Sequence, residues 1–188
     1  IIRGSGDTLE DLSKWNFEPE QPILRDSEDY WFCFFQNSTY KLDGITPNQG
    51  NVFKYVIPSR AVSSNPRATK DLLLRIADKA NKDIIASGVS DKNLNFLAIC
   101  TTTIIPFYLI GQCKYRAKRL VALSPGTDIS ECITTSILTK ELIEEVKRKN
   151  GNPRCFYKVV MEELDPINHI DSISKETAVD IHFGRHDK

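Results

Sequence analysis

The sequence predicts an α+β fold in which an antiparallel sheet, containing a three-stranded meander, is packed by two to four helices. Three apolar runs, Leu94–Cys100, Ile104–Gly111 and Tyr115–Leu123, follow one another with only a few polar residues between them. Links this short hold no crossover helix, so we expect the adjacent strands to pair antiparallel. An aromatic run at Tyr30–Phe35 and a helical pattern between Arg67 and Ser87 complete the evidence for a mixed sheet-and-helix domain.

The N-terminal half of the chain supplies two strands and the clearest helix. Tyr30–Phe35 is apolar on both faces, which predicts a central strand. Asn51–Ile57 predicts a further strand, ended by Pro58. From Arg67 to about Ser87, apolar residues recur at i, i+3, i+4 and i+7, and Gly88 provides a C-terminal stop.

The C-terminal half is less regular. Residues 128–138 fit a helix, although their two adjacent threonines weaken the pattern. Lys140–Asn150 predicts a firmer helix, Arg154–Glu162 a strand, and Val179–Phe183 one more short strand.

The predicted domain organisation has three parts. Residues 1–29 form an acidic segment with a short helix, residues 30–164 the α+β core, and residues 165–188 a C-terminal tail that adds a short strand. The chain begins with Ile1, which predicts that it is a fragment of a larger protein.

Composition narrows the class of protein. The 188 residues are enough to bury a core, and 40% of them are hydrophobic. No apolar run approaches the ~20 residues that a membrane helix needs, so we expect no membrane partner. Five cysteines form no CxxC pair, which predicts structural thiols in an intracellular compartment, the cytoplasm or the nucleus.

Charge is distributed unevenly although the net charge is zero. Residues 1–30 hold 3 basic and 8 acidic side chains, residues 31–158 hold 19 and 10, and residues 159–188 hold 3 and 7. A basic body between acidic ends indicates an anionic partner, or acidic ends that neutralise the body.

The third strand of the predicted meander carries the strongest functional signal. Because alternate residues of a strand share a face, Lys114, Arg116 and Lys118 are expected to project together, with Arg119 following them. Such a face suits phosphates or an acidic protein surface. Lysines that protect an edge strand from aggregation are an equally good explanation. Arg148 and Lys149 are lesser candidates, because a helix C-terminus attracts cations through its dipole alone.

Catalytic and metal-binding patterns are weak. The sequence contains no GxSxG, GxxxxGK[ST], HExxH or GxGxxG motif. Glu145-Val146-Lys147 has a spacing known from metal-dependent nucleases but is expected on a helix, and His169 lies in a polar stretch that predicts an exposed loop. We therefore expect no cofactor, no metal and no catalytic residue that the sequence alone can name.

The sequence thus favours a non-catalytic interaction domain of a larger protein that presents a basic sheet surface to an acidic protein segment. One alternative is a nucleic-acid-binding module that uses the same basic strand. The other is an enzyme with a dispersed active site, in which His169 or the pair Glu145 and Lys147 would line a pocket.

Overall fold

The computed structural model describes residues 19–37, 44–58, 62, 64–126, 128–135 and 140–183. Its centre is a five-stranded sheet with the strand order β2-β1-β3-β4-β5, in which every neighbouring pair is parallel. The prediction of an antiparallel α+β sheet was therefore wrong, and the fold is α/β. The strands are β1 (Tyr30–Asn37), β2 (Asn51–Pro58), β3 (Leu94–Ile99), β4 (Arg119–Leu123) and β5 (Ala178–His182).

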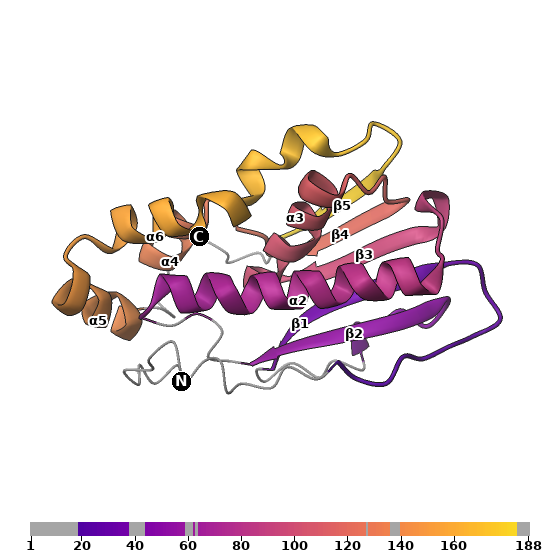
Figure 1. Ribbon diagram of the computed structural model, residues 1–188, viewed down its shortest axis with the longest axis horizontal. Helices are drawn as coiled ribbons and strands as arrows, with labels where there is room; N and C mark the ends of the chain where they lie inside the picture. Colours follow the sequence, from indigo (N-terminus) through magenta and orange to yellow (C-terminus); the bar gives the residue numbers. More distant parts are fainter. Residues whose placement is uncertain are drawn as a thin grey trace.

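Helices connect the strands from β2 onwards and explain why the sheet is parallel. Helix α2 links β2 to β3, α3 links β3 to β4, and α4 to α6 precede β5 (Figure 1). A crossover of this kind returns the chain to the same end of the sheet, so the next strand runs in the same direction. The helices are α2 (Pro66–Ser87), α3 (Ile104–Cys113), α4 (Ile129–Thr135), α5 (Lys140–Asn150) and α6 (Pro153–Met161).

The segment Ile104–Gly111, predicted as the middle strand of a meander, forms helix α3 instead. Most of this helix is buried, so apolar residues occur all round it and the helical period is hidden. Helix α3 is therefore the crossover between β3 and β4, which the sequence analysis had excluded because the polar links are short.

Of two further predicted strands, one is shorter than expected and the other is absent. Lys114 ends α3 in a left-handed conformation (φ 61°), and the strand predicted at Tyr115–Leu123 begins only at Arg119, as β4. Arg154–Glu162, predicted as a strand, lies mostly in helix α6. There the Asn152 side chain accepts the Arg154 amide and Pro153 occupies the first turn, which is a favourable helix start.

Other predictions are confirmed. The aromatic strand β1 is central, between β2 and β3. Helix α2 begins at the Asn65 cap and ends at Gly88, whose φ of 65° suits glycine. Helix α5 and the short strand β5 occur where the sequence predicted a helix and a strand. The short helix expected before Trp15 lies outside the described residues.

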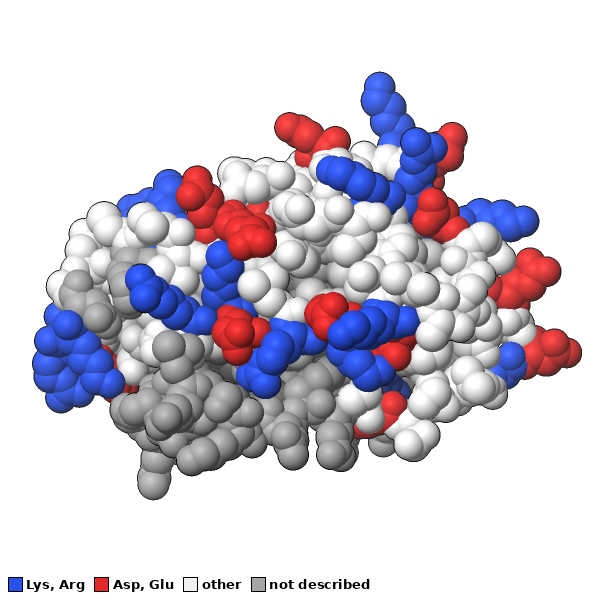
Figure 2. Space-filling view, viewed as in Figure 1, with Lys and Arg blue, Asp and Glu red and all other residues white. Residues whose placement is uncertain are grey.

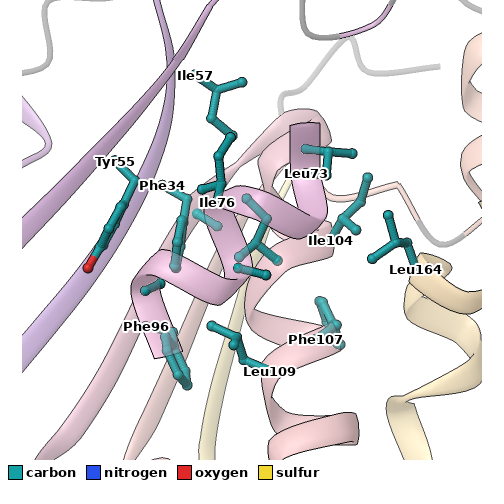
Figure 3. Close-up of a cluster of buried hydrophobic side chains, with 14 of the residues drawn as sticks. Phe34, Tyr55, Ile57, Leu73, Ile76, Phe96, Ile104, Phe107, Leu109 and Leu164 are labelled. Carbon is teal, nitrogen blue, oxygen red and sulfur yellow. The ribbon is translucent and has the colours of Figure 1, made fainter. Parts of the chain in front are cut away.

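The core lies between the sheet and the helices on one of its faces. Figure 3 shows Ile76 of α2 beside Phe34 of the sheet and Leu109 of α3 beside Phe96, all in one buried cluster. Phe34 stacks on Tyr55 with the ring centroids 5.1 Å apart. A second, smaller apolar cluster lies on the opposite face of the sheet and comprises Cys33, Phe35, Val52 and Leu97, with Trp31, Ile45, Ile99, Val121 and Leu123 against it.

Candidate functional site at the carboxyl end of the sheet

The strand order contains a topological switch point between β1 and β3. The chain moves outward from β1 to β2 and then crosses to the other side of β1 to form β3. In open parallel sheets of this kind, ligands bind beyond the carboxyl ends of the strands at the switch point. The residue that follows β3 at this place is Cys100, the first residue of a short 3-10 helix (Cys100–Thr103) that continues into α3.

Cys100 has an unusual backbone for a residue with a side chain. Its φ is +55°, in the left-handed region. Residues other than glycine rarely adopt this region, and residues held in it are enriched at active sites and ligand clamps. The side chain of Cys100 is exposed, and its sulfur lies 3.7 Å from the hydroxyl of Thr101. The turn therefore presents a thiol to solvent where a strand passes into a helix.

The threonines after Cys100 fix this turn. The buried hydroxyl of Thr102 donates to the carbonyl of Phe34 in β1 at 2.7 Å and accepts the amide of Ile99 at 3.0 Å. The hydroxyl of Thr103 donates to the carbonyl of Cys100 at 2.7 Å. Thr102 thus joins the turn to both strands of the switch point, which holds the conformation of Cys100.

The neighbouring strand ends lie level with this turn. Ile99, Leu123 and His182 are in register across β3, β4 and β5. Ser124, which follows β4, also has a positive φ (48°), and its amide donates to the carbonyl of His182 at 2.6 Å. The exposed His182 is two strands from β3, about 10 Å by ordinary strand spacing. A thiol, a hydroxyl and an imidazole therefore lie at the carboxyl ends of neighbouring strands of the sheet.

The start of α4 adds an acid and a second thiol near this edge. The hydroxyl of Ser130 and the amide of Glu131 donate to Asp128 and lower the pKa of its carboxyl group. Partial burial raises the pKa of the Cys132 thiol, and the sulfur packs close to the backbone of Gly126. Asp128 therefore acts as a helix cap, and Cys132 is less readily ionised than an ordinary thiol.

The predicted basic strand face does not exist, because its members lie in the α3–β4 connection. Lys118 forms an ion pair with Asp29 at 2.9 Å, and Arg119 forms one with Asp180 at 2.5 Å. Lys114 and Arg116 are exposed beside them, and all four lie near the amino ends of the strands. They thus lie at the amino ends of the strands, whereas Cys100 lies at the carboxyl ends.

Arg148 and Lys149 lie elsewhere, on α5, where basic side chains gather at one end of the molecule (Figure 2). Lys149 donates to the buried Glu145 at 2.6 Å, and the Ser64 hydroxyl donates to the same oxygen at 3.0 Å. These bonds, that of Lys149 first, lower the pKa of Glu145. The cluster attaches α5 to the segment before α2, and the structure does not bring it together with Lys114–Arg119.

His169, expected in an exposed loop, is buried instead. Its Nε2 lies 2.8 Å from the carbonyl oxygen of Glu163, and its ring meets Tyr108 edge-on with centroids 5.8 Å apart. It packs on Gly111, in the last turn of α3 and ten residues beyond Thr101. His169 therefore fixes the segment after α6 to α3 and is remote from Cys100.

The five cysteines are free thiols. Cys33 is buried and packs as a small apolar side chain, whereas the other four are exposed. Burial strongly raises the pKa of the Cys33 thiol. Within the described ranges there is no group of three or more metal-binding side chains, and no helix is both long and apolar enough to cross a membrane.

The signal of the Cys100 turn in the sequence is faint. Ala98 and Thr102 are small residues two positions before and after Cys100, where a GxSxG turn has glycines. This spacing gains meaning only when β3 is followed by a helix, and the sequence reading had placed a second strand there.

Comparisons with known proteins show similarity to solved structures but to no described family. No family model matches the chain, and no curated protein matches its sequence. A chain of the Glycosylation Associate Protein (Gap123) complex from Streptococcus agalactiae is similar over 81% of this chain and 31% of its own length, with a TM-score of 0.49 and 8% identity. A phospholipase/carboxylesterase from Dyadobacter fermentans is similar over 92% of this chain and 90% of its own, with a TM-score of 0.48 and 9% identity.

Proposed function

We propose that the chain is a thiol-dependent acyl-transfer enzyme with Cys100 as its nucleophile. The observation that carries the proposal is the exposed thiol on a left-handed strand-to-helix turn at the switch point of a parallel sheet. Nucleophiles of acyl-transfer enzymes on parallel sheets occupy strained turns of this kind, where the reactive atom stands clear of the backbone.

The turn also supplies a means to stabilise charge. The backbone amide of Thr101, directly after the nucleophile, is at the start of the helical segment that becomes α3. Amides at a helix start lack intrahelical acceptors and favour a thiolate or an oxyanion. Thr102 and Thr103 hold the turn in place before substrate arrives, so little reorganisation is needed.

The proposed reaction has two steps. In the first step the Cys100 thiol gives up its proton as its sulfur attacks the carbonyl carbon of an ester or thioester. The new carbon–sulfur bond forms, the bond from that carbon to the leaving oxygen or sulfur breaks, and the alcohol or thiol leaves with the proton that Cys100 gave up. In the second step water or an acceptor hydroxyl attacks the same carbon, the bond to the Cys100 sulfur breaks, the acyl group leaves on the new oxygen, and the proton of the attacking hydroxyl returns to the sulfur. The nearest imidazole described at this edge is that of His182, which would need a substrate or water between it and the thiol.

The test is to trap the acyl group. The protein is incubated with p-nitrophenyl acetate, nitrophenol release is followed, and the acetylated peptide is identified by mass spectrometry. We expect acetylation at Cys100, and a loss of about 100-fold or more in turnover in Cys100→Ala. The matched control is Cys132→Ala, another exposed thiol near this edge. Full turnover in Cys100→Ala, or acetylation spread equally over all exposed cysteines, would refute the proposal.

A second candidate function is an interaction domain with an acidic partner. A hollow of about 400 Å³ at the amino ends of the strands is the observation that favours it. Arg116 and Lys118 line this hollow with Lys92, and the acidic Asp91 and Glu176 share it. An acidic protein segment is the proposed partner, and nucleic acid is the alternative.

Charge reversal tests whether this surface binds an acidic partner, and salt dependence distinguishes a protein segment from nucleic acid. Reversing Lys114, Arg116 and Lys118 should abolish binding of an acidic peptide while circular dichroism stays unchanged, and reversing Arg148 at the far end should have no effect. Binding of duplex DNA would fall by roughly 0.9 log units per phosphate contact for each log unit of salt. Equal binding by all variants would end this candidate.

A further inference from the structure

The two outer edges of the sheet differ. The edge of β2 is closed by the segment before β1, because Ile23 and Val52 exchange two backbone hydrogen bonds of 2.9 Å. At the other edge, β5 pairs only with β4 among the described strands. An open edge strand is a template for another strand, and proteins usually block it with charged side chains, above all lysine, with proline or with a bulge. The sequence of β5, Ala-Val-Asp-Ile-His, has no lysine or proline, and its one charged side chain, Asp180, is ion-paired with Arg119 of the neighbouring β4.

The backbone of β5 shows which groups remain available. The amide of Ala178 donates to Lys118 in the connection before β4, and the carbonyl of His182 accepts from Ser124 beyond it. In a parallel ladder, the residues that bond to one neighbour alternate with residues that point to the other side. Val179 and Ile181 therefore direct their amides and carbonyls away from β4, toward the open edge.

The side chains of the same strand are unusually exposed for apolar residues. Val179 is 41% exposed, Ile181 49% and the adjoining Phe183 65%. By register Val179 and Ile181 lie on the face with Leu120, which elsewhere is covered by helices. Along β5, exposed apolar side chains thus coincide with backbone groups that have no strand partner among the described residues.

We propose that β5 pairs with β5 of a second copy of this chain, antiparallel and centred on Ile181. The two-fold axis then places Ile181 opposite itself and Val179 opposite Phe183 of the second copy, so that apolar side chains meet on one face. On the other face, Asp180, which is ion-paired with Arg119 of its own chain, lies opposite the polar His182 of the second copy. Apolar cross-strand pairs stabilise a sheet, and this register sets no two like charges opposite each other.

The register follows from the charges. Pairing centred on Asp180 would set two carboxylates directly opposite each other, which is unfavourable. Pairing centred on Ile181 avoids this contact and uses the outward backbone groups of Ile181 as the hydrogen-bonded pair on the axis. A self-complementary strand with a two-fold axis is the usual basis of a closed dimer, which would extend the sheet across both copies.

The first test is the mass in solution, which does not depend on the proposed catalysis. Light scattering across a concentration series should give twice the 21.3 kDa of one chain, and Ile181→Lys should give the single-chain mass. The matched control is Val159→Lys, because Val159 is also exposed and apolar but lies on α6. A single-chain mass for the unaltered protein at every concentration would overturn the proposal.

The second test reads the register and remains valid if Ile181→Lys fails to fold. In Ile181→Cys the two axial Cα atoms lie about 5.5 Å apart, within disulfide range, so diamide should link peptides that contain residue 181. Val179→Cys should give no such self-link, because Val179 faces Phe183 of the second copy. His182→Asp should weaken the dimer about fivefold, whereas His182→Lys should keep it. Self-links in Val179→Cys that equal those in Ile181→Cys would refute the register.

Discussion

Gly111 is expected to be essential to stability because of its contact with His169. A Cβ atom at Gly111 would lie 2.1 Å from Nδ1 and 2.7 Å from Cγ of the His169 ring. Both distances are far below van der Waals contact, and the ring is buried. Gly111→Ala must therefore displace His169 or bend α3.

The magnitude follows from two opposing effects. Alanine stabilises a helix relative to glycine by about 1 kcal/mol. Overpacking a filled site costs about 1–3 kcal/mol, and loss of the His169 hydrogen bond to Glu163 adds about 1 kcal/mol. We therefore expect Gly111→Ala to lower the free energy of unfolding by about 1–3 kcal/mol.

The assay is urea denaturation of four proteins: the unaltered chain, Gly111→Ala, His169→Ala and the double variant. In the His169→Ala background the ring is absent, so Gly111→Ala should be neutral or stabilise by up to about 1 kcal/mol through helix propensity. The sign of the effect should therefore change with the residue at position 169. If Gly111→Ala stabilises the unaltered chain, or destabilises both backgrounds equally, the packing argument is incorrect.

Three other predictions concern the turn and the helix attachments. Thr102→Val removes the hydroxyl that bonds to Phe34, so it should lower the free energy of unfolding in urea by about 1–3 kcal/mol. The same variant should change the rate at which iodoacetamide alkylates Cys100. An unaltered rate would show that Thr102 does not hold the turn. Glu145→Gln should destabilise at neutral pH, because Lys149 and Ser64 lower the folded pKa of Glu145. The difference in free energy of unfolding between this variant and the unaltered chain should shrink as the pH falls from the unfolded pKa of about 4.3 through the lower folded pKa, because protonated Glu145 loses its ion pair. A difference that does not change with pH would contradict the ion pair. Asn65→Ala should lower the thermal midpoint through a loss of about 1 kcal/mol at the start of α2, and no shift would show that this cap is dispensable.

The candidate site was only partly accessible to sequence reasoning. The basic residues Lys114–Arg119 were conspicuous because charge is visible in a sequence, yet two of them are ion-paired. Cys100 was treated as a small apolar residue at the end of a strand. The proposed reactivity of Cys100 depends on a backbone angle and on the strand order, and neither of these leaves a clear mark in the sequence.

Elements with a local pattern could be predicted from the amino-acid sequence. Helix α2 has one face in the core and the other in solvent, so its apolar period and its end at Gly88 are readable. Strand β1 is apolar on both faces because it is central, and the aromatic run records that burial directly.

The way in which these elements join depends on tertiary contacts that the sequence does not reveal. Helix α3 is enclosed between the sheet and the segment that carries His169, so it needs no polar face and resembles a strand in sequence. Once α3 is a helix, it becomes the crossover that makes β3 and β4 parallel. The direction of β4 and the place of Cys100 between a strand and a helix follow from that assignment, whereas the switch point follows from the order of β2, β1 and β3. Both depend on contacts between residues distant in the chain.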